Sequence, residues 1–132
     1  MIDKQTFHHI GYATTDIAKE YEHFASLGYE IEADIFEDHI QGVRGCFIVG
    51  PGPRIELLEN LGASHTLAPW IDAGVKFYHL AYTVDNIDLA IDWFEKQRAM
   101  MTISPVPAVA FNNRKIAFFM MRNRQLIELI ER

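Results

Sequence analysis

Two stretches of this 132-residue chain are nearly the same, and they constrain its fold more than any other feature. FHHIGYATTDI, near the N-terminus, and FYHLAYTVDNI, in the middle of the chain, each carry a histidine in third position, His9 and His79. A second repeated motif closes each half in the same order, as IELLE (Ile55–Glu59) and IELIE (Ile127–Glu131). Agreement at both ends of each half indicates an internal duplication rather than a chance likeness between strands.

A predicted helix follows the first strand of each half. The pairs Thr15-Asp16 and Asp85-Asn86 are helix-capping residues, and apolar residues recur after them at helical spacing. Three strand-like segments then follow in each half: GYEIEADIF, GVRGCFIV and RIELLEN in the first, and MMTIS, RKIAFFMM and QLIELIER in the second. Each half therefore predicts the order β-α-β-β-β.

This order predicts an α+β fold made of two paired βαβββ modules. We expect one domain, residues 1–132, in which a connector of about 61–76 joins module 1 (about 6–60) to module 2 (about 77–132). The net charge of −6 argues against nucleic-acid binding, and no apolar run is long enough to span a membrane. The single cysteine, Cys46, and the opening MIDKQTF, which lacks an apolar signal region, predict a cytoplasmic protein.

Four polar residues fall inside predicted strands, where burial is costly without a partner: His9, Glu56, His79 and Glu128. Taken singly, each is more often structural than a metal ligand. Their symmetric placement favours a different interpretation. If the modules pair about a pseudo-twofold axis, two imidazoles and two carboxylates converge. Such a set suits a six-coordinate divalent transition metal with two positions open to water or substrate.

On these residues the chain resembles the vicinal oxygen chelate superfamily, the glyoxalase, bleomycin-resistance and dioxygenase group. Within that group it is similar to methylmalonyl-CoA epimerase-like proteins, through HHIGYA, QGVRGCFI, IELLENLG, HTLAPWI, YHLAYTVDNID, RKIAFF and LIELIE. The resemblance implies a curved, cup-shaped mixed sheet with the helices on its convex side. It places His9, Glu56, His79 and Glu128 on the four ligand positions, which implies one divalent ion (Co, Ni, Zn or Mn).

The resemblance also implies a reaction in which a proton is removed from the carbon next to a carbonyl group. The expected substrate is an acyl-CoA or another thioester or carbonyl compound. Glu128 is the catalytic base by this resemblance. Gly45 stands where some epimerases carry a second basic glutamate, so Glu56 is our candidate for the second catalytic base.

Five further residues are candidates for substrate binding. Arg114 and Lys115 follow FNN and are candidates for contact with a phosphate or carboxylate, although exposed charge pairs are more often only solvated. Phe47, Phe119 and Met121 are expected on the concave face of the cup, although such residues in strands are more often core.

Three other functions share parts of this pattern. A lactoylglutathione lyase of the glyoxalase I type uses the same kind of metal site. A ring-cleaving dioxygenase uses two histidines and one carboxylate, so a fourth ligand at Glu56 argues against it. A metal-free small-molecule binding or resistance protein is the third alternative. Because proteins of this group form the cup within one chain or across two, we also expect a homodimer.

Overall fold

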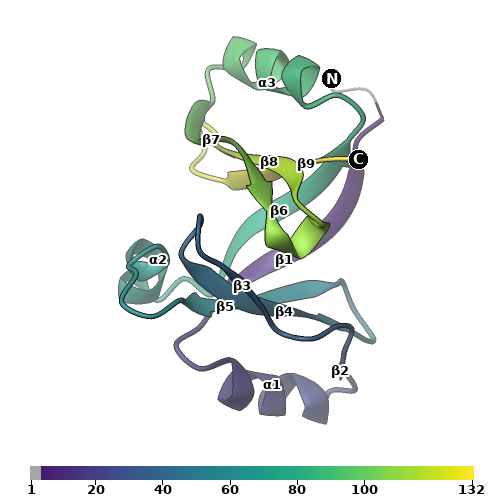
Figure 1. The fold of residues 1–132 in the computed structure, drawn as a ribbon, viewed down its shortest axis with the longest axis vertical. Helices are drawn as coiled ribbons and strands as arrows, with labels where there is room; N and C mark the ends of the chain where they lie inside the picture. Colours follow the sequence, from purple (N-terminus) through teal and green to yellow (C-terminus); the bar gives the residue numbers. More distant parts are fainter. Residues whose placement is uncertain (1–3) are drawn as a thin grey trace. The chain divides into compact units, whose positions relative to one another are not determined.

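The computed structural model describes residues 4–132, and the first three residues of MIDKQTF lie outside it. The described chain divides into two compact units. The N-terminal unit comprises residues 9–78, and the C-terminal unit comprises residues 4–8 together with 79–132. Each unit contains one long helix and a mixed β-sheet (Figure 1). The expected α+β class, with two βαβββ modules, is confirmed.

The N-terminal unit follows the predicted order of elements except that two short strands replace the second predicted strand. Its strands are ordered β2-β4-β5-β1, with β3 also paired to β4; β1 runs parallel to β5, whereas β4 runs antiparallel to β5. The elements are β1 (Thr6–Ala13), α1 (Ile17–Ser26), β2 (Glu30–Ile31), β3 (Phe36–Asp38), β4 (Val43–Val49), β5 (Ile55–Asn60) and α2 (Ala68–Ala73).

The predicted strand GYEIEADIF is two short strands, β2 and β3, separated by residues 32–35. Its alternation of apolar and charged residues predicted one continuous strand. However, Ile31 and Ile35 remain 52% and 47% exposed, so burial contributes little to holding this edge segment on β4.

The C-terminal unit repeats the arrangement with an unbroken edge strand. Its strands are ordered β6-β9-β8-β7; β6 and β9 are parallel and the other neighbours are antiparallel. The segment MMTIS is the start of a longer strand, β7. The elements are β6 (Phe77–Val84), α3 (Ile87–Lys96), β7 (Met100–Ala108), the 3-10 turn η1 (Val109–Phe111), β8 (Arg114–Met120) and β9 (Leu126–Glu131).

Both long helices begin with the same double cap. The side chains of Asp16 and Asn86 each accept the backbone N–H three residues later, at 3.1 Å. A carboxylate oxygen of Glu59 accepts the first N–H of α1 at 2.9 Å, and one of Glu131 accepts the first N–H of α3 at 3.2 Å. These bonds satisfy N–H groups that a helix start leaves without an intrahelical partner, so the duplicated sequence starts its helices at equivalent places.

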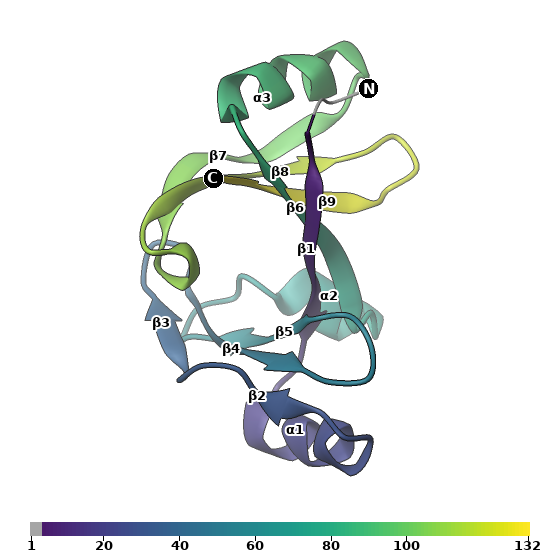
Figure 2. The same cartoon turned by 90° about the vertical axis from the view of Figure 1, so that its right-hand side faces the viewer.

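Each helix covers one face of the sheet in its own unit (Figures 1 and 2). The core beneath α1 contains Tyr12, Ile17, Tyr29, Cys46, Ile48, Ile55 and Leu57. The core beneath α3 contains Val84, Ile87, Ala90, Phe94, Ala117, Phe119, Ile127 and Leu129. Within residues 4–132, no helix has the length and apolar character needed to cross a membrane.

Candidate metal centre

In the N-terminal unit, strand register brings a histidine and a glutamate together. The parallel pairing of β1 and β5 sets Glu56 opposite Gly11. His9 precedes Gly11 by two residues, so its side chain lies on the same face of β1. Nε2 of His9 lies 3.2 Å from Oε1 of Glu56. Because Gly11 has no side chain, the imidazole can reach across its position to the carboxylate.

The C-terminal unit contains the same arrangement. The parallel pairing of β6 and β9 sets Glu128 opposite Ala81, and His79 precedes Ala81 by two residues. Nε2 of His79 lies 3.1 Å from Oε2 of Glu128. A small residue again occupies the position between them, so the two units present equivalent His–Glu pairs.

All four side chains are deeply buried. The exposed fractions are 0% for His9, 4% for Glu56, 2% for His79 and 3% for Glu128. A buried carboxylate is unfavourable unless a cation or hydrogen-bond donors compensate its charge. Each buried glutamate therefore needs a compensating partner, such as the histidine beside it. Burial also keeps water away from both side chains.

The donor atoms of each pair fit a divalent transition metal. Two ligands bound at right angles, about 2.1 Å from an ion, are about 3.0 Å apart. The observed separations of 3.2 and 3.1 Å are close to that value. The same separations also allow a direct N–H···O hydrogen bond, whose range is about 2.7–3.2 Å. Imidazole nitrogen and carboxylate oxygen are the ligand types such ions take, so each pair offers two suitable ligand atoms.

A phenylalanine ring lies against each histidine. Phe47 pairs with Glu56 across β4 and β5, and its ring meets the ring of His9 edge-on at 5.2 Å. Phe118 pairs with Glu128 across β8 and β9, and its ring meets that of His79 edge-on at 5.1 Å. Phe47 therefore lies on the predicted face. These rings restrict the orientation of the imidazoles.

The prediction that Phe119 and Met121 share this face is wrong. Phe118 pairs with Glu128, so strand alternation places Phe119 on the other face of β8, where its ring stacks on Phe94 of α3 at 5.0 Å. Met121 packs against the same core. Sequence reasoning missed Phe118, although its place 71 residues after Phe47 in the duplicated pattern was a usable signal.

Gly45, the position of the absent second base, is closely packed. A Cβ atom there would lie 2.6 Å from Cδ2 of Leu58, 2.8 Å from the carbonyl oxygen of Leu57 and 2.9 Å from Cζ of Phe36. Real Cβ atoms essentially never approach other heavy atoms so closely. The position therefore has no room for a side chain, basic or otherwise, unless β3 or β5 moves.

Arg114 and Lys115 lie at the exposed start of β8. Nε of Arg114 donates a hydrogen bond to the carbonyl oxygen of Phe111 at 3.0 Å. Both side chains are accessible to an anionic group, and their role in substrate binding stays a prediction. Cys46 lies on the helix-covered face of β4, in the core beneath α1. Burial, with a smaller effect of the Glu56 charge, raises the pKa of its thiol.

Comparison with known proteins connects this arrangement to one family. The sequence profile of the Glyoxalase/Bleomycin resistance protein/Dioxygenase superfamily matches residues 8–118. An ethylmalonyl-CoA/methylmalonyl-CoA epimerase of Cereibacter sphaeroides is 29% identical over 127 residues, which cover 92% of this chain and 93% of the relative. The family match includes three of the four residues, His9, Glu56 and His79, and ends before Glu128.

Solved structures share the fold. A hypothetical protein from Bacillus halodurans C-125 has a TM-score of 0.84 and 26% identity, covering 98% of this chain and 96% of its own. Methylmalonyl-CoA epimerase from Mycobacterium tuberculosis has a TM-score of 0.78 and 24% identity, covering 95% of this chain and 86% of its own.

Proposed function

The chain belongs to the glyoxalase/bleomycin resistance protein/dioxygenase superfamily, and from this premise we propose that it is a divalent-metal-dependent epimerase of a methylmalonyl-CoA-like thioester. The observation that carries the proposal is the duplicated, buried His–Glu pair. The similarity to an ethylmalonyl-CoA/methylmalonyl-CoA epimerase supports the substrate class.

In this proposal His9, Glu56, His79 and Glu128 hold one Co, Ni, Zn or Mn ion. The two pairs come from one chain, or from the two chains of a homodimer. When bound, such an ion acts as a Lewis acid that makes the C–H next to a thioester carbonyl more acidic.

The chain's own residues then handle the proton. Glu128 removes it from the carbon next to the carbonyl, and Glu56 returns a proton to the opposite face, which inverts the configuration. Gly45 cannot take the second role, because glycine has no side chain to act as a base. Phe47 and Phe118 keep the imidazoles oriented. Arg114 and Lys115 bind an anionic group of the substrate, such as a phosphate of coenzyme A.

Metal content tests the first half of the proposal. The purified protein is loaded with cobalt, nickel or zinc, dialysed, and analysed for its elements. We expect about one ion per chain, and a loss of that ion in the double variant His9→Ala/His79→Ala. The matched control is His23→Ala/His39→Ala, which removes two exposed histidines. Metal content that is the same in both double variants contradicts the metal site.

Proton exchange tests the second half. The metal-loaded protein is incubated in D₂O with methylmalonyl-CoA, and separately with the hemithioacetal of methylglyoxal and glutathione. Deuterium at the carbon next to the thioester, with inversion, supports the epimerase. Conversion of the hemithioacetal alone identifies a lactoylglutathione lyase, which has the same donor set. A metal-loaded protein that acts on neither contradicts the proposed reaction.

A further inference from the structure

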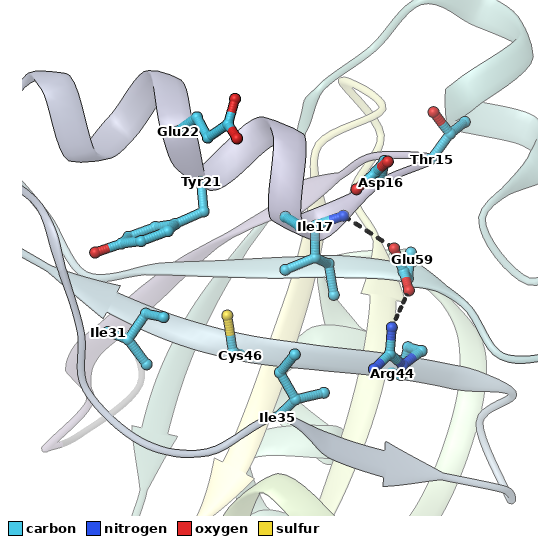
Figure 3. Close-up of a pocket in the computed structure, with 11 residues that line it drawn as sticks. Thr15, Asp16, Ile17, Tyr21, Glu22, Ile31, Ile35, Arg44, Cys46 and Glu59 are labelled. Carbon is cyan, nitrogen blue, oxygen red and sulfur yellow. Dashed lines mark hydrogen bonds and ion pairs between the residues drawn. The ribbon is translucent and has the colours of Figure 1, made fainter.

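A cavity of about 750 Å³ lies in the N-terminal unit, on the face of the sheet that α1 covers. Figure 3 shows it between α1, the segment that carries Ile31 and Ile35, and strand β4. Arg44 and Cys46 line it from the face of β4 opposite Phe47, and Glu59 lines it from the face of β5 opposite Glu56. The cavity is therefore separate from the His9–Glu56 pair.

The broken edge strand accounts for this cavity. Between β2 and β3 the chain leaves the sheet, and Ile31 and Ile35 lie beside the opening instead of packing in a continuous strand. In the C-terminal unit the corresponding edge is one strand, β7, and α3 packs closely on β8 through Phe94 and Phe119. The cavity thus lies where the edge strand of the N-terminal unit is interrupted.

The lining offers apolar surface that the fold leaves partly exposed. Ile17 and Cys46 form a buried floor, whereas Ile31 and Ile35 are about half exposed. The hydroxyl of Tyr21 donates to the carbonyl oxygen of Tyr29 at 3.2 Å, so its ring lines the cavity while its polar end is engaged. The volume is within the range of small-molecule sites, about 300–1,000 Å³. An aliphatic body of a few carbons would bury this surface.

The polar lining favours a cation. Asp16 and Glu59 accept the N–H groups at the start of α1, and Arg44 is paired with Glu59 (Figure 3). The helix start and the guanidinium are thus already compensated by carboxylates. Two carboxylates, those of Asp16 and Glu59, and one guanidinium leave a formal charge of −1, and the carboxylate of Glu22 lies on the outer side of α1 (Figure 3). An anionic head group would meet an excess of like charge, whereas an ammonium head would be attracted.

We propose that this cavity binds a small amphiphilic cation, with an aliphatic body against Ile31 and Ile35 and an ammonium head beside the carboxylates of α1 and β5. The site does not depend on the proposed metal or reaction.

The test uses NMR of the metal-free protein with ¹³C-labelled isoleucine methyl groups. Hexylammonium is the probe, and hexanoate and hexanol have the same chain with an anionic and a neutral head. We expect hexylammonium to shift the methyl signals of Ile17, Ile31 and Ile35 with saturation. Hexanoate should bind at least tenfold more weakly. Equal binding of hexanoate, or shifts spread over isoleucines of both units, would overturn the proposal.

Two variants of the same helix provide the matched control. Ala18 is exposed and lines the cavity, whereas Ala25 is exposed on α1 and does not line it. Ala18→Trp should fill the cavity and abolish the shifts, while Ala25→Trp should leave them unchanged; the methyl spectrum itself shows whether each variant is folded. Hexylammonium shifts that survive Ala18→Trp contradict the site. His9→Ala/His79→Ala should retain them, which separates this result from that of the proposed function.

Discussion

Glu56 and Glu59 stand three residues apart on β5 and point to opposite faces of the N-terminal sheet. Glu56 faces His9, whereas Glu59 accepts the first backbone N–H of α1. Glu128 and Glu131 divide the same tasks on β9. One strand motif, with glutamates three residues apart, thus serves both the candidate metal centre and the attachment of the covering helix.

Replacing Glu59 by alanine should lower the free energy of unfolding by about 1–2 kcal/mol, because α1 loses a cap and Arg44 loses its partner. Glu131→Ala should lower it by less, since Glu131 caps α3 without a comparable arginine pair among the described contacts. Urea unfolding measures both, with the exposed Glu95→Ala as control. A Glu59→Ala variant as stable as this control would contradict the cap.

Replacing Glu56 or Glu128 by glutamine should separate metal binding from catalysis. The amide oxygen can still bind an ion but cannot remove a proton, so metal content should persist. Turnover should fall by about 10²–10⁴-fold in each variant if both residues act as bases. Steady-state rates with methylmalonyl-CoA, alongside elemental analysis, measure this. Unchanged turnover in Glu56→Gln would show that Glu56 is not the second base.

Adding one methyl group at Gly45 should destabilise the N-terminal unit by about 1–3 kcal/mol, because the new atom would clash with Leu58, Leu57 and Phe36. The double variant Gly45→Ala/Phe36→Ala relieves only the clash with the ring. It should therefore remain less stable than Phe36→Ala alone, since the backbone oxygen of Leu57 cannot move away easily. Thermal or urea unfolding of the four proteins forms the test. Equal stability of Gly45→Ala/Phe36→Ala and Phe36→Ala would mean that β5 can move away from the new methyl group without loss of stability.

Tyr12 should make stability depend on pH in the alkaline range. Burial raises the pKa of its hydroxyl, and the hydrogen bond and charge of Glu20 raise it further. The unfolded chain loses this proton near pH 10, while the folded chain retains it. The stabilisation is therefore complete below about pH 10 and is lost as the pH rises above that value.

Tyr12→Phe isolates this effect because phenylalanine keeps the ring and removes the titrating group. The unfolding free energy of this variant should decline less steeply above pH 10 than that of the unchanged protein. Urea unfolding between pH 8 and pH 11 measures both slopes. Parallel declines would assign the alkaline loss to other groups.

Much of the fold could be predicted because the same strand and helix signals occur in both halves of the sequence. The helix starts, the order β-α-β-β-β and the strands around Glu56 and Glu128 follow from capping residues and local periodicity. The break between β2 and β3 could not be predicted. Alternating residues at 30–36 satisfy the strand pattern, but whether an edge strand stays paired depends on how much of Ile31 and Ile35 its neighbours bury.

Spacing and residue type are local properties, so they were enough to predict the class of fold, the repeated order of elements and the four polar residues that the strands bury. Which aromatic residue faces His79 depends on long-range packing: the register between β8 and β9 selects Phe118 over Phe119, and a one-residue shift exchanges the two faces. The tertiary structure also decided that Phe36 and Leu58 fill the space at Gly45, and that a cavity opens beneath α1. These features depend on packing between segments distant in the chain, which no local pattern encodes.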